Sequence, residues 1–446
     1  MSLKSTIRNI APRKAFGAYH FVWAWLGAKA ARHPSEKLFV IGVTGTKGKT
    51  TTLELLNAIL EAAGKKTALL SSLRMKIGDT TMKNRTGNSM PGRAYIQSFL
   101  NAARAARCGY ALVEVTSQGV VAHRHRFTNW NMGVMTNLSP EHIESHGSFE
   151  NYRAAKLSFL KYVLKKGGKV FLNADDQHFD FFSDALIEAR EKVVTVTVKD
   201  RWLQDRLAKS SPQRSPVQSL NSHGEEDGSA ATQAHSQARS QFFLSQFNEQ
   251  NVALAAGVAR ELGIADAVIE EAVRNFAGVP GRMEFVFGGP YFGIVDYAHT
   301  PDSLLAAYSA ARSLLANDDA KLICVLGGAG GGRDTWKRPE MGKIAAHYCD
   351  EIILTDEDPY DEDPNAIIDQ VAAGIADTPY PKPTPVRIVD RHEALQHAVG
   401  MMREGDIVIA TGKGSEDWIH RARGRKDPWN EKEIMQAILG KKSQEE

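Results

Sequence analysis

The stretch FVIGVTGTKGKTTTLELL, residues 39–56, constrains the fold of this chain more than any other segment. A branched apolar run enters a Gly-Thr-Lys-Gly-Lys-Thr loop and leaves it as a sequence of helical period. Backbone N–H groups of a glycine-rich loop at the start of a helix form a ready site for anions. A lysine in such a loop reaches the outer phosphates of a nucleotide, and the following hydroxyl can hold Mg²⁺. The stretch therefore predicts a strand–loop–helix unit that binds phosphate.

Lys49 and Thr50 occupy the lysine and hydroxyl positions and follow Gly48. The strict pattern G-x-x-x-x-G-K-[ST] is not met, because its first glycine position is Val43 and the other glycine is Gly45. The loop favours binding of ATP or GTP. A glycine-rich turn that binds no nucleotide is the alternative that the loop alone leaves open.

Short branched runs alternate with segments of helical period between residues 38 and 127. This alternation predicts a doubly wound α/β domain with a mainly parallel sheet. A second alternation begins after residues 278–286, and each of its strand-like runs ends in a polar or glycine-rich loop. It predicts a second, Rossmann-like domain. In such open α/β sheets, ligands bind at the loops where the strands end.

The 446-residue chain is accordingly divided into three parts: a helical segment at 1–37, a central domain at 38–280 and a C-terminal domain at 281–446. Within the central domain, residues 203–240 are polar, rich in Ser, Gln, Ala and Gly, and without hydrophobic period. This composition predicts a disordered insertion rather than a folded element.

The charge is almost balanced, with 55 basic and 52 acidic residues, and gives no electrostatic reason to expect a nucleic-acid partner. The three cysteines, Cys108, Cys324 and Cys349, are scattered and form no CxxC motif. A sparse, odd set of cysteines is typical of a reducing compartment. We therefore expect a cytoplasmic protein without a disulfide framework.

A 14-residue apolar and aromatic run begins at Ala15 and is too short to span a membrane, which takes about 20 residues. Four basic residues flank it: Arg13, Lys14, Lys29 and Arg32. His20 and the many aromatic residues argue against a signal peptide. Residues 15–32 are therefore interpreted either as a helix packed on the following domain or as a helix that lies on a membrane surface.

Two acidic segments are candidates for metal binding. Glu114 ends the run ALVE, where a carboxylate can complete a Mg²⁺ site, although an exposed acid without function is the simpler interpretation. The segment 136–147 contains two acids and two histidines: Glu141, His142, Glu144 and His146. Its spacing does not match H-E-x-x-H, which argues against zinc.

The glycine-rich run GGAGGGRD, residues 327–334, follows a predicted strand but fits G-x-G-x-x-G in no frame. We interpret it as a flexible substrate loop followed by a charged cluster: Arg333, Asp334, Lys337 and Arg338. Cations placed in this way can clamp a carboxylate. A solvated, charged helix start is the alternative.

Ten segments, taken in order along the chain, resemble the motifs of the Mur ligase family, and in particular its UDP-N-acetylmuramoyl-tripeptide synthetase branch. They are GVTGTKGKTTT, EVTSQGVVAHRHRF, TNLSPEHIESHGSFENYRAAK, NADD, FNEQN, GVPGRMEFV, IVDYAHTPDSL, GGRDTWKRPEMG, DEDPYDEDP and ATGKGSEDW. The family comprises ATP-dependent amide ligases of peptidoglycan precursor synthesis. The resemblance covers about residues 38–200 and 241–440, and it implies a central ATPase domain with a C-terminal Rossmann-like domain.

The resemblance implies a reaction in two steps. A peptide carboxylate attacks the γ-phosphate of ATP to form an acyl phosphate, and the amine of an amino acid then displaces phosphate. Such phosphoryl transfer depends on positioning and charge neutralisation. The implied cofactors are ATP and Mg²⁺, the implied substrates are a UDP-N-acetylmuramoyl-dipeptide-like acceptor and an amino acid, and the expected state is a monomer.

The resemblance also assigns roles to individual residues. The implied catalytic residues are Lys49, Glu114, His142 and Lys156, and the implied metal ligands are Thr50, Glu114, His142 and Lys156 in carbamylated form. The implied nucleotide contacts are Gly45, Thr46, Gly48, Lys49, Thr50, Thr51, Asn248, Asn251, Arg282, Asp296 and His299. The implied substrate contacts are Thr86, Thr116, Arg124, Arg338, Asp358, Tyr360, Gly412 and Glu416. Without the resemblance, Lys156 is read as a lysine on a helix surface.

Two departures from the family leave alternatives open. Tyr360 stands where diaminopimelate-adding enzymes read arginine, and six nearby acids, Asp356 to Asp358 and Asp361 to Asp363, predict a negative site that favours lysine or another diamine. Only about 37 residues precede the loop strand, where the family has a domain that holds the uridine nucleotide. The alternatives are a ligase for a lipid-linked, folate-like or polyglutamate-like carboxylate, and a nucleotide-binding module without catalysis.

Overall fold

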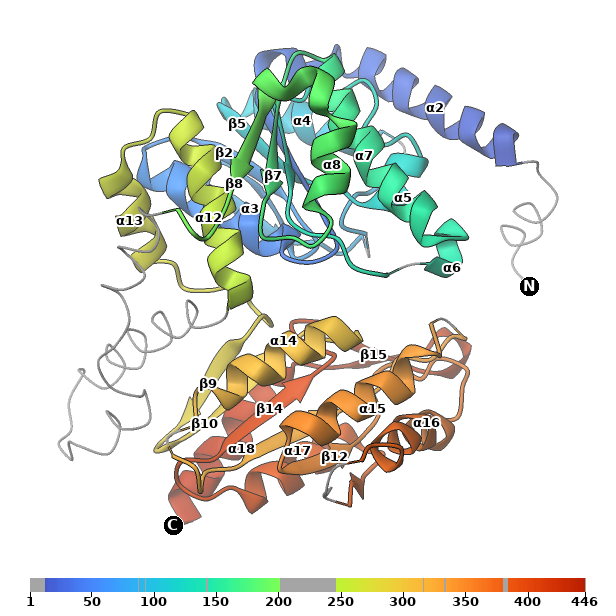
Figure 1. Ribbon diagram of the computed structural model, residues 1–446, viewed down its shortest axis with the longest axis vertical. Coiled ribbons are helices and arrows are strands. Elements are labelled where there is room, and N and C mark those ends of the chain that lie inside the picture. Colours follow the sequence, from blue (N-terminus) through green and yellow to red (C-terminus); the bar gives the residue numbers. More distant parts are fainter. Residues whose placement is uncertain are drawn as a thin grey trace. The chain divides into compact units, whose positions relative to one another are not determined.

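The computed structural model describes residues 13–86, 88–92, 94–141, 143–200, 246–315, 317–332, 334–379 and 384–445 (Figure 1). The predicted insertion at 203–240, the predicted role of His142 and the candidate cation Arg333 lie outside the described residues. The described chain forms two compact units: residues 13–200 with Glu249–Phe276, and residues 246–248 with 277–445.

The first unit is built on an eight-stranded sheet in the order β4-β3-β2-β5-β1-β6-β7-β8 (Figure 1). Strands β2, β5, β1, β6, β7 and β8 run parallel, and β3 and β4 form an antiparallel edge. The strands are β1 (Phe39–Thr44), β2 (Thr67–Leu70), β3 (Arg74–Ile77), β4 (Thr80–Lys83), β5 (Tyr110–Glu114), β6 (Met132–Met135), β7 (Lys169–Asn173) and β8 (Val193–Val196). The central strands are buried almost throughout, as expected of a parallel sheet with both faces covered.

Helices connect these strands. They are α2 (Arg13–Ala30), α3 (Lys49–Ala62), α4 (Tyr95–Ala105), α5 (Ser117–Val121), α6 (Ile143–His146), α7 (Phe149–Lys165), α8 (Phe179–Ala185), α12 (Gln246–Glu261) and α13 (Asp266–Arg274), with 3₁₀ turns η1 (Pro34–Lys37) and η2 (Ile187–Lys192). Helix α7 packs closely on β1, where a Cβ on Gly42 would lie 2.6 Å from Phe159 and 2.8 Å from Trp130.

The second unit contains a six-stranded sheet in the order β13-β12-β11-β14-β10-β9, parallel except for β9, and a separate hairpin of β15 and β16. Its strands are β9 (Glu284–Gly288), β10 (Tyr291–Asp296), β11 (Leu322–Leu326), β12 (Glu351–Leu354), β13 (Val386–Arg387), β14 (Ile407–Thr411), β15 (Trp418–His420) and β16 (Lys426–Pro428). Its helices are α14 (Pro301–Arg312), α15 (Lys337–Tyr348), α16 (Pro364–Ala376), α17 (Arg391–Met401) and α18 (Glu431–Glu445), with the turn η3 (Ala422–Gly424).

The second sheet has a buried apolar cluster on each side, and the first sheet has one that includes Val40 and Val113. Helices cover these clusters, so the predicted α/β fold is confirmed. The antiparallel hairpins β3–β4 and β15–β16 are not part of the prediction. Their strands are short and largely polar or exposed, so they lack the apolar runs that reveal buried strands.

The sequence predicts no disulfide framework, and the structure contains a disulfide that the sequence analysis did not foresee. Cys324 in β11 is bonded to Cys349, which directly follows α15 and lies two residues before β12. These residues are 25 positions apart in sequence, but β11 and β12 are paired in parallel, which brings their Cα atoms to 6.0 Å. The separation of the two cysteines in sequence therefore did not indicate how close they are in space. Cys108 is free and buried.

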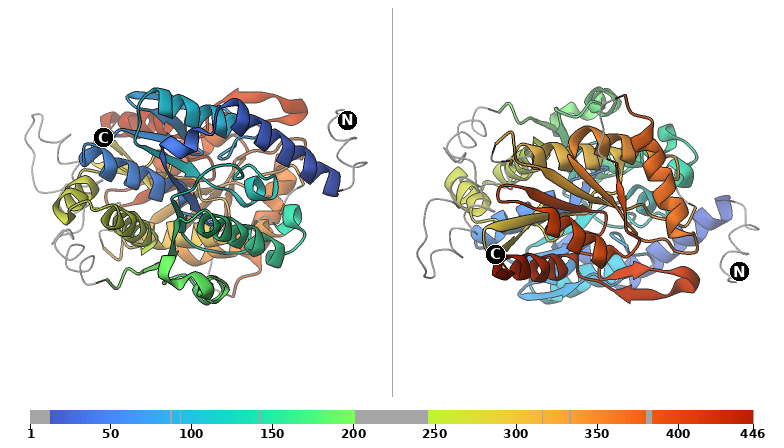
Figure 2. Two further views of the ribbon diagram at one scale, coloured as in Figure 1. Left: turned by 90° about the horizontal axis from the view of Figure 1, so that it is seen from above. Right: turned by 90° about the horizontal axis from the view of Figure 1, so that it is seen from below.

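None of the helices that the structure describes is long and apolar enough to cross a membrane. Helix α2 lies on the outside of the first unit, beside α4 (Figures 1 and 2).

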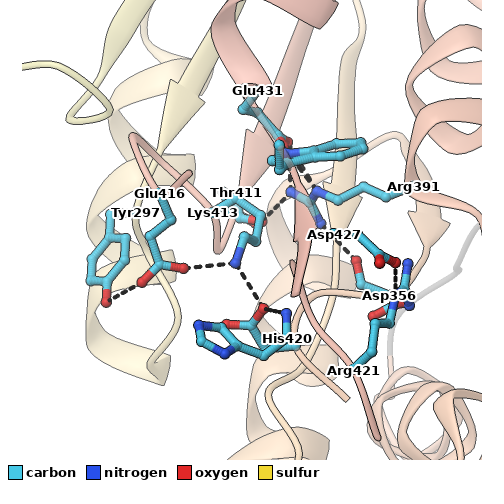
Figure 3. Close-up of polar contacts among 12 residues, drawn as sticks. Tyr297, Asp356, Arg391, Thr411, Lys413, Glu416, His420, Arg421, Asp427 and Glu431 are labelled. Carbon is cyan, nitrogen blue, oxygen red and sulfur yellow. Dashed lines mark hydrogen bonds and ion pairs between the residues drawn. The ribbon is translucent and has the colours of Figure 1, made fainter. Parts of the chain in front are cut away.

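A buried ion pair connects two helices of the second unit. Arg391 at the start of α17 is bonded to Glu431 at the start of α18 at 2.6 Å, and both side chains are 0 % exposed. The Arg391 guanidinium also donates to the carbonyl oxygens of Asp356, at 3.1 Å, and Thr411, at 2.8 Å (Figure 3). The pair thus joins two helices to the residues that follow β12 and end β14.

We expect Arg391→Met to lower the free energy of unfolding of this unit by about 3–5 kcal/mol, because it leaves the Glu431 charge buried without a cationic partner. Urea unfolding followed by circular dichroism measures the loss. The matched double variant, Arg391→Met with Glu431→Leu, removes both charges and should lose clearly less. Equal losses in the single and double variants would contradict this account.

Candidate active site

The loop between β1 and α3 requires glycine at two positions. Gly45 has φ 149° and Gly48 has φ 77°. A Cβ on Gly45 would lie 1.8 Å from the Thr136 hydroxyl, and one on Gly48 would lie 2.2 Å from Oδ1 of Asn251. Space as well as backbone conformation therefore explains why the glycines stand at these positions.

Lys49 folds back over this loop. Its ammonium donates to the carbonyl oxygens of Thr46, at 2.7 Å, and Gly45, at 3.1 Å. The Thr46 hydroxyl is hydrogen-bonded to the Tyr152 hydroxyl at 2.9 Å, and Thr51 is buried in the first turn of α3. The loop thus presents a positive charge at the N-terminus of a helix, where phosphate is favoured.

Thr50 and Glu114 lie together because β1 and β5 are parallel neighbours, with Val43 in register with Glu114. The Thr50 hydroxyl donates to Oε2 of Glu114 at 2.9 Å, and the Ser72 amide donates to the same oxygen at 2.9 Å. Glu114 is 2 % exposed, so its interpretation as an exposed acid is wrong.

The donor set around Thr50 fits Mg²⁺. No group of three or more His, Cys, Asp or Glu residues suited to a metal occurs among the described residues. Mg²⁺ is commonly held by one or two carboxylates together with phosphate oxygens and waters. A hydroxyl and a buried carboxylate, next to a phosphate loop, provide hard oxygen ligands of this kind.

Lys156 is not a surface residue, as the sequence alone would suggest, but is 1 % exposed. Its ammonium donates to the Gly45 carbonyl oxygen at 2.6 Å and lies 4.6 Å from the centre of the Tyr152 ring. Burial holds the pKa of Lys156 well below its usual range, and the nearby charge of Lys49 lowers it further. The site therefore favours a neutral amine.

Asn248 and Asn251 lie one turn apart in α12, and both are buried. Oδ1 of Asn251 accepts a hydrogen bond from the Thr52 hydroxyl at 3.2 Å, and its buried Nδ2 has no hydrogen-bond partner. The Asn251 amide is therefore a donor close to the glycine loop.

The predicted acceptor contacts occupy different environments. Thr116 caps α5 by accepting from the Gly119 amide, and the Arg124 guanidinium lies close to Gly92. Burial lowers the pKa of Arg124. Thr86 is exposed and donates to Asn84 at 2.7 Å.

In the second unit, Asp296 ends β10 and accepts from the amides of Met283 and Ala298, each at 2.7 Å. The Arg282 guanidinium lies 4.1 Å from the centre of the Tyr297 ring, and Nδ1 of His299 is hydrogen-bonded to the Tyr297 carbonyl oxygen at 2.8 Å. The predicted nucleotide contacts Arg282, Asp296 and His299 are thus gathered around one turn.

Lys413 is the centre of a second polar group in this unit (Figure 3). Its buried ammonium donates to Asp358 at 2.8 Å and to Glu416 at 2.7 Å, and Glu416 accepts from the Tyr297 hydroxyl at 3.2 Å. Tyr360 stacks on His420 with ring centres 5.1 Å apart. Sequence reasoning missed Lys413, although it stands in the GKGSED run between two predicted contacts.

Three of the six acids in the segment 356–363, which the sequence predicts to form a negative site, are ion-paired. Asp356 pairs with Arg421, Asp358 with Lys413, and Glu362 with Arg338 at 2.9 Å. Arg338 itself is 0 % exposed and also donates to Gln370 and to the Ala329 carbonyl oxygen. The compensating cations come from distant parts of the sequence, so a local count of acids overstates the negative charge.

Glu357 differs from the three paired acids. It is buried, and its Oε2 has no hydrogen-bond partner. The carboxylate lies against Gly412, where a Cβ would come within 2.6 Å of it, and φ of Gly412 is 105°. Burial raises the pKa of Glu357 to about 7.

Sequence reasoning also missed Ser72, Thr136 and Tyr152. They contact Thr50, Gly45 and Thr46 through space, from other strands and helices. Tyr152 precedes Lys156 by one helical turn, and this spacing is the signal that could have identified it.

Comparison with known proteins agrees with the α/β fold. Residues 43–259 match the Mur ligase middle domain, and residues 281–414 match the Mur ligase, glutamate ligase domain. The chain therefore belongs to the Mur ligase family and is an ATP-dependent amide ligase. Members of this family use ATP and Mg²⁺.

Two curated relatives are UDP-N-acetylmuramoyl-L-alanyl-D-glutamate–2,6-diaminopimelate ligases. The protein from Syntrophomonas wolfei is 35 % identical over 400 residues, which cover 89 % of this chain and 77 % of the relative. The protein from Aquifex aeolicus is 33 % identical over 411 residues, which cover 91 % of this chain and 78 % of the relative.

Solved structures agree in fold. A ligase of the same name has a TM-score of 0.57 at 25 % identity and covers 91 % of this chain and 79 % of its own. A bifunctional folylpolyglutamate synthase/dihydrofolate synthase from Yersinia pestis has a TM-score of 0.60 at 16 % identity and covers 90 % of this chain and 95 % of its own. The second likeness shows the fold alone.

We expect Glu357→Gln to change how the stability of the second unit depends on pH. The unfolded chain releases the Glu357 proton near pH 4.5, whereas in the folded protein the pKa of Glu357 is about 7, so the proton is held up to about pH 7. The folded state binds more protons between these values, so stability falls as the pH rises from 4.5 to about 7, by about 3 kcal/mol.

Thermal unfolding across this pH range measures the effect. The glutamine variant should lose this part of the pH dependence, while all other titrating groups are common to both proteins. A variant with the same slope as the unchanged protein would show that Glu357 titrates normally.

Proposed function

We propose that this ligase joins an amino acid to the peptide carboxylate of a UDP-N-acetylmuramoyl-dipeptide in peptidoglycan precursor synthesis. The names of the relatives support this acceptor, because they match over about three quarters of their length. The observation that carries the proposal is the convergence of Lys49, Thr50, Glu114 and Lys156 on one glycine loop.

In the first step, the acceptor carboxylate attacks the γ-phosphate of ATP, the bond to the bridging oxygen breaks, and ADP leaves. Lys49 and the loop amides hold the phosphates, together with Gly45, Thr46, Gly48 and Thr51. Thr50 and Glu114 would hold Mg²⁺, which neutralises phosphate charge. His142 is proposed as a further ligand from the motif alone.

Lys156 is proposed to act as a carbamate. Its neutral amine attacks CO₂, a C–N bond forms, a proton passes to solvent, and the side chain becomes an anion. The burial of Lys156 and the nearby Lys49 charge support this step, since both favour the neutral amine, and Lys49 can then pair with the carbamate. A carbamate so placed can serve as a metal ligand.

In the second step, the incoming amine attacks the acyl phosphate, and inorganic phosphate leaves the tetrahedral intermediate. Thr86, Thr116 and Arg124 are proposed to contact the acceptor. Nucleotide contacts are proposed for Asn248, Asn251, Arg282, Asp296 and His299, and amino-acid contacts for Arg338, Asp358, Tyr360, Gly412 and Glu416.

The preferred amino acid is proposed to be lysine or another diamine without a distal carboxylate. The acidic segment supports this less than its sequence suggested, because three of its six acids are ion-paired. The remaining support is Tyr360, which stacks on His420 and offers no guanidinium to a second carboxylate.

The enzyme is proposed to work in the cytoplasm as a monomer on small-molecule substrates, without a nucleic-acid partner. Residues 15–32 are proposed as a peripheral contact with a membrane.

The proposed reaction predicts phosphate release from ATP that requires both UDP-N-acetylmuramoyl-dipeptide and an amine. Lysine, ornithine and diaminopimelate are compared in parallel, and mass spectrometry identifies the product. ATP binding without phosphate release for any amine would reject this acceptor and leave lipid-linked, folate-like or polyglutamate-like carboxylates, or a module without catalysis.

Tyr360→Arg should raise kcat/KM for diaminopimelate relative to lysine about tenfold or more, because a hydrogen bond to a carboxylate contributes about 1.5–3 kcal/mol. Tyr360→Phe keeps the ring and adds no cation, so it should leave the ratio unchanged. An unaltered ratio in the arginine variant would remove Tyr360 from amine selection.

Lys156→Ala should lower kcat about 10²–10³-fold, as the loss of a charged group at a phosphoryl-transfer centre commonly does. The unchanged enzyme should gain activity when bicarbonate is added to CO₂-depleted buffer, and the alanine variant should not. Lys161→Ala, on the exposed side of the same helix, is the matched control and should retain activity.

A further inference from the structure

Helix α2 turns its small residues towards the protein. Gly17, Ala24, Gly27 and Ala28 recur at intervals of three, four and seven and form one face of the helix. Ala24 and Ala28 are buried, and a Cβ on Gly27 would lie 2.8 Å from Cβ of Ala94. This face lets α2 approach the first unit closely.

The large apolar side chains of α2 are exposed instead. Six of them are each between 41 % and 47 % exposed: Tyr19, Phe21, Val22, Trp23, Trp25 and Leu26. A surface helix of a globular protein normally has the opposite arrangement, with large apolar residues on the packed face. We refer to these six residues as the aromatic face of α2.

The charge of the same segment has one sign. Between Arg13 and Ser35 the sequence has four Lys or Arg residues and no Asp or Glu. Lys29 lies over the Trp25 ring, 5.3 Å from its centre, so a cation adjoins the aromatic face. Tryptophan, tyrosine and basic residues together are typical of helices that lie in the interface of a bilayer.

We propose that the aromatic face of α2 binds the surface of an anionic lipid bilayer. The large apolar residues enter the region between headgroups and acyl chains, and the basic residues contact lipid phosphates. Charge complementarity selects this partner, because an uncharged apolar surface would make no use of the basic residues.

Helix α2 packs beside Arg124, one of the proposed acceptor contacts, so a bilayer bound to α2 would lie near the acceptor. Phe21 packs on His123 and Phe127, with ring centres 5.9 Å and 5.0 Å away, and these residues flank Arg124. Ala94, which Gly27 touches, lies two residues after Gly92, the neighbour of Arg124. If Arg124 contacts the acceptor, a point that rests on the proposed function, acceptor binding takes place next to the membrane.

The test is sedimentation of the full-length protein with vesicles. Vesicles of phosphatidylglycerol and phosphatidylethanolamine should bind the protein at least tenfold more tightly than phosphatidylcholine vesicles, and added salt should weaken binding. Replacing Trp23 and Trp25 by serine should reduce binding at least tenfold. Trp418→Ser removes a tryptophan that is also 42 % exposed, in the second unit, and should bind as the unchanged protein does.

A second variant guards against misfolding. Lys29→Glu with Arg32→Glu keeps the aromatic face and should reduce binding to anionic vesicles, while ATP binding is retained in both variants. Absence of vesicle binding, or equal binding by the double tryptophan variant, would overturn the proposal. A concentration-dependent dimer would also overturn the proposal if the same tryptophan substitutions dissociated it. The partner of the aromatic face would then be a second copy of the chain.

These measurements use no ligase substrate. Vesicle binding without phosphate release would therefore retain this inference and reject the proposed acceptor, and the reverse result would reject this inference alone.

Discussion

The carbonyl oxygen of Gly45 accepts hydrogen bonds from two lysine side chains, Lys49 from its own helix and Lys156 from α7. Two ammonium groups that share one acceptor in a buried place repel one another, and the more buried one is more readily neutral. Burial and the Lys49 charge together lower the pKa of Lys156, so its amine is more readily neutral than that of an exposed lysine. The arrangement depends on Gly45, because a side chain there would collide with Thr136 and displace the carbonyl oxygen.

The second unit handles charge differently. Most of its buried ions are neutralised in pairs, such as Arg391 with Glu431 and Lys413 with Asp358. Breaking one such pair costs several kcal/mol of stability. Because Arg391 also donates to the carbonyl oxygens of Asp356 and Thr411, the ends of β12 and β14 are held in place. Glu357, which lacks a partner at Oε2, stands out against this background as a group that can still respond to a ligand or to pH.

The fold was predictable because alternating branched runs and helical periods report buried parallel strands directly. The glycine loop with Lys49 and Thr50 was predictable for a similar reason, since the whole loop is contiguous in sequence. The burial of Lys156 and Glu114, the ion pairs of the acidic segment and the disulfide were not, because each depends on partners brought together by the sheets. The residue roles and domain boundaries taken from the family resemblance stay predictions.

The disulfide between Cys324 and Cys349 encloses the glycine-rich run at 327–332 and helix α15, which carries Arg338. A cross-link of this kind reduces the number of conformations that the enclosed segment can adopt in the unfolded chain. In a reducing compartment the cross-link is absent, so the glycine-rich segment loses more conformational entropy when it folds. The folding of the part that carries a proposed amino-acid contact is thus tied to the redox state of its surroundings.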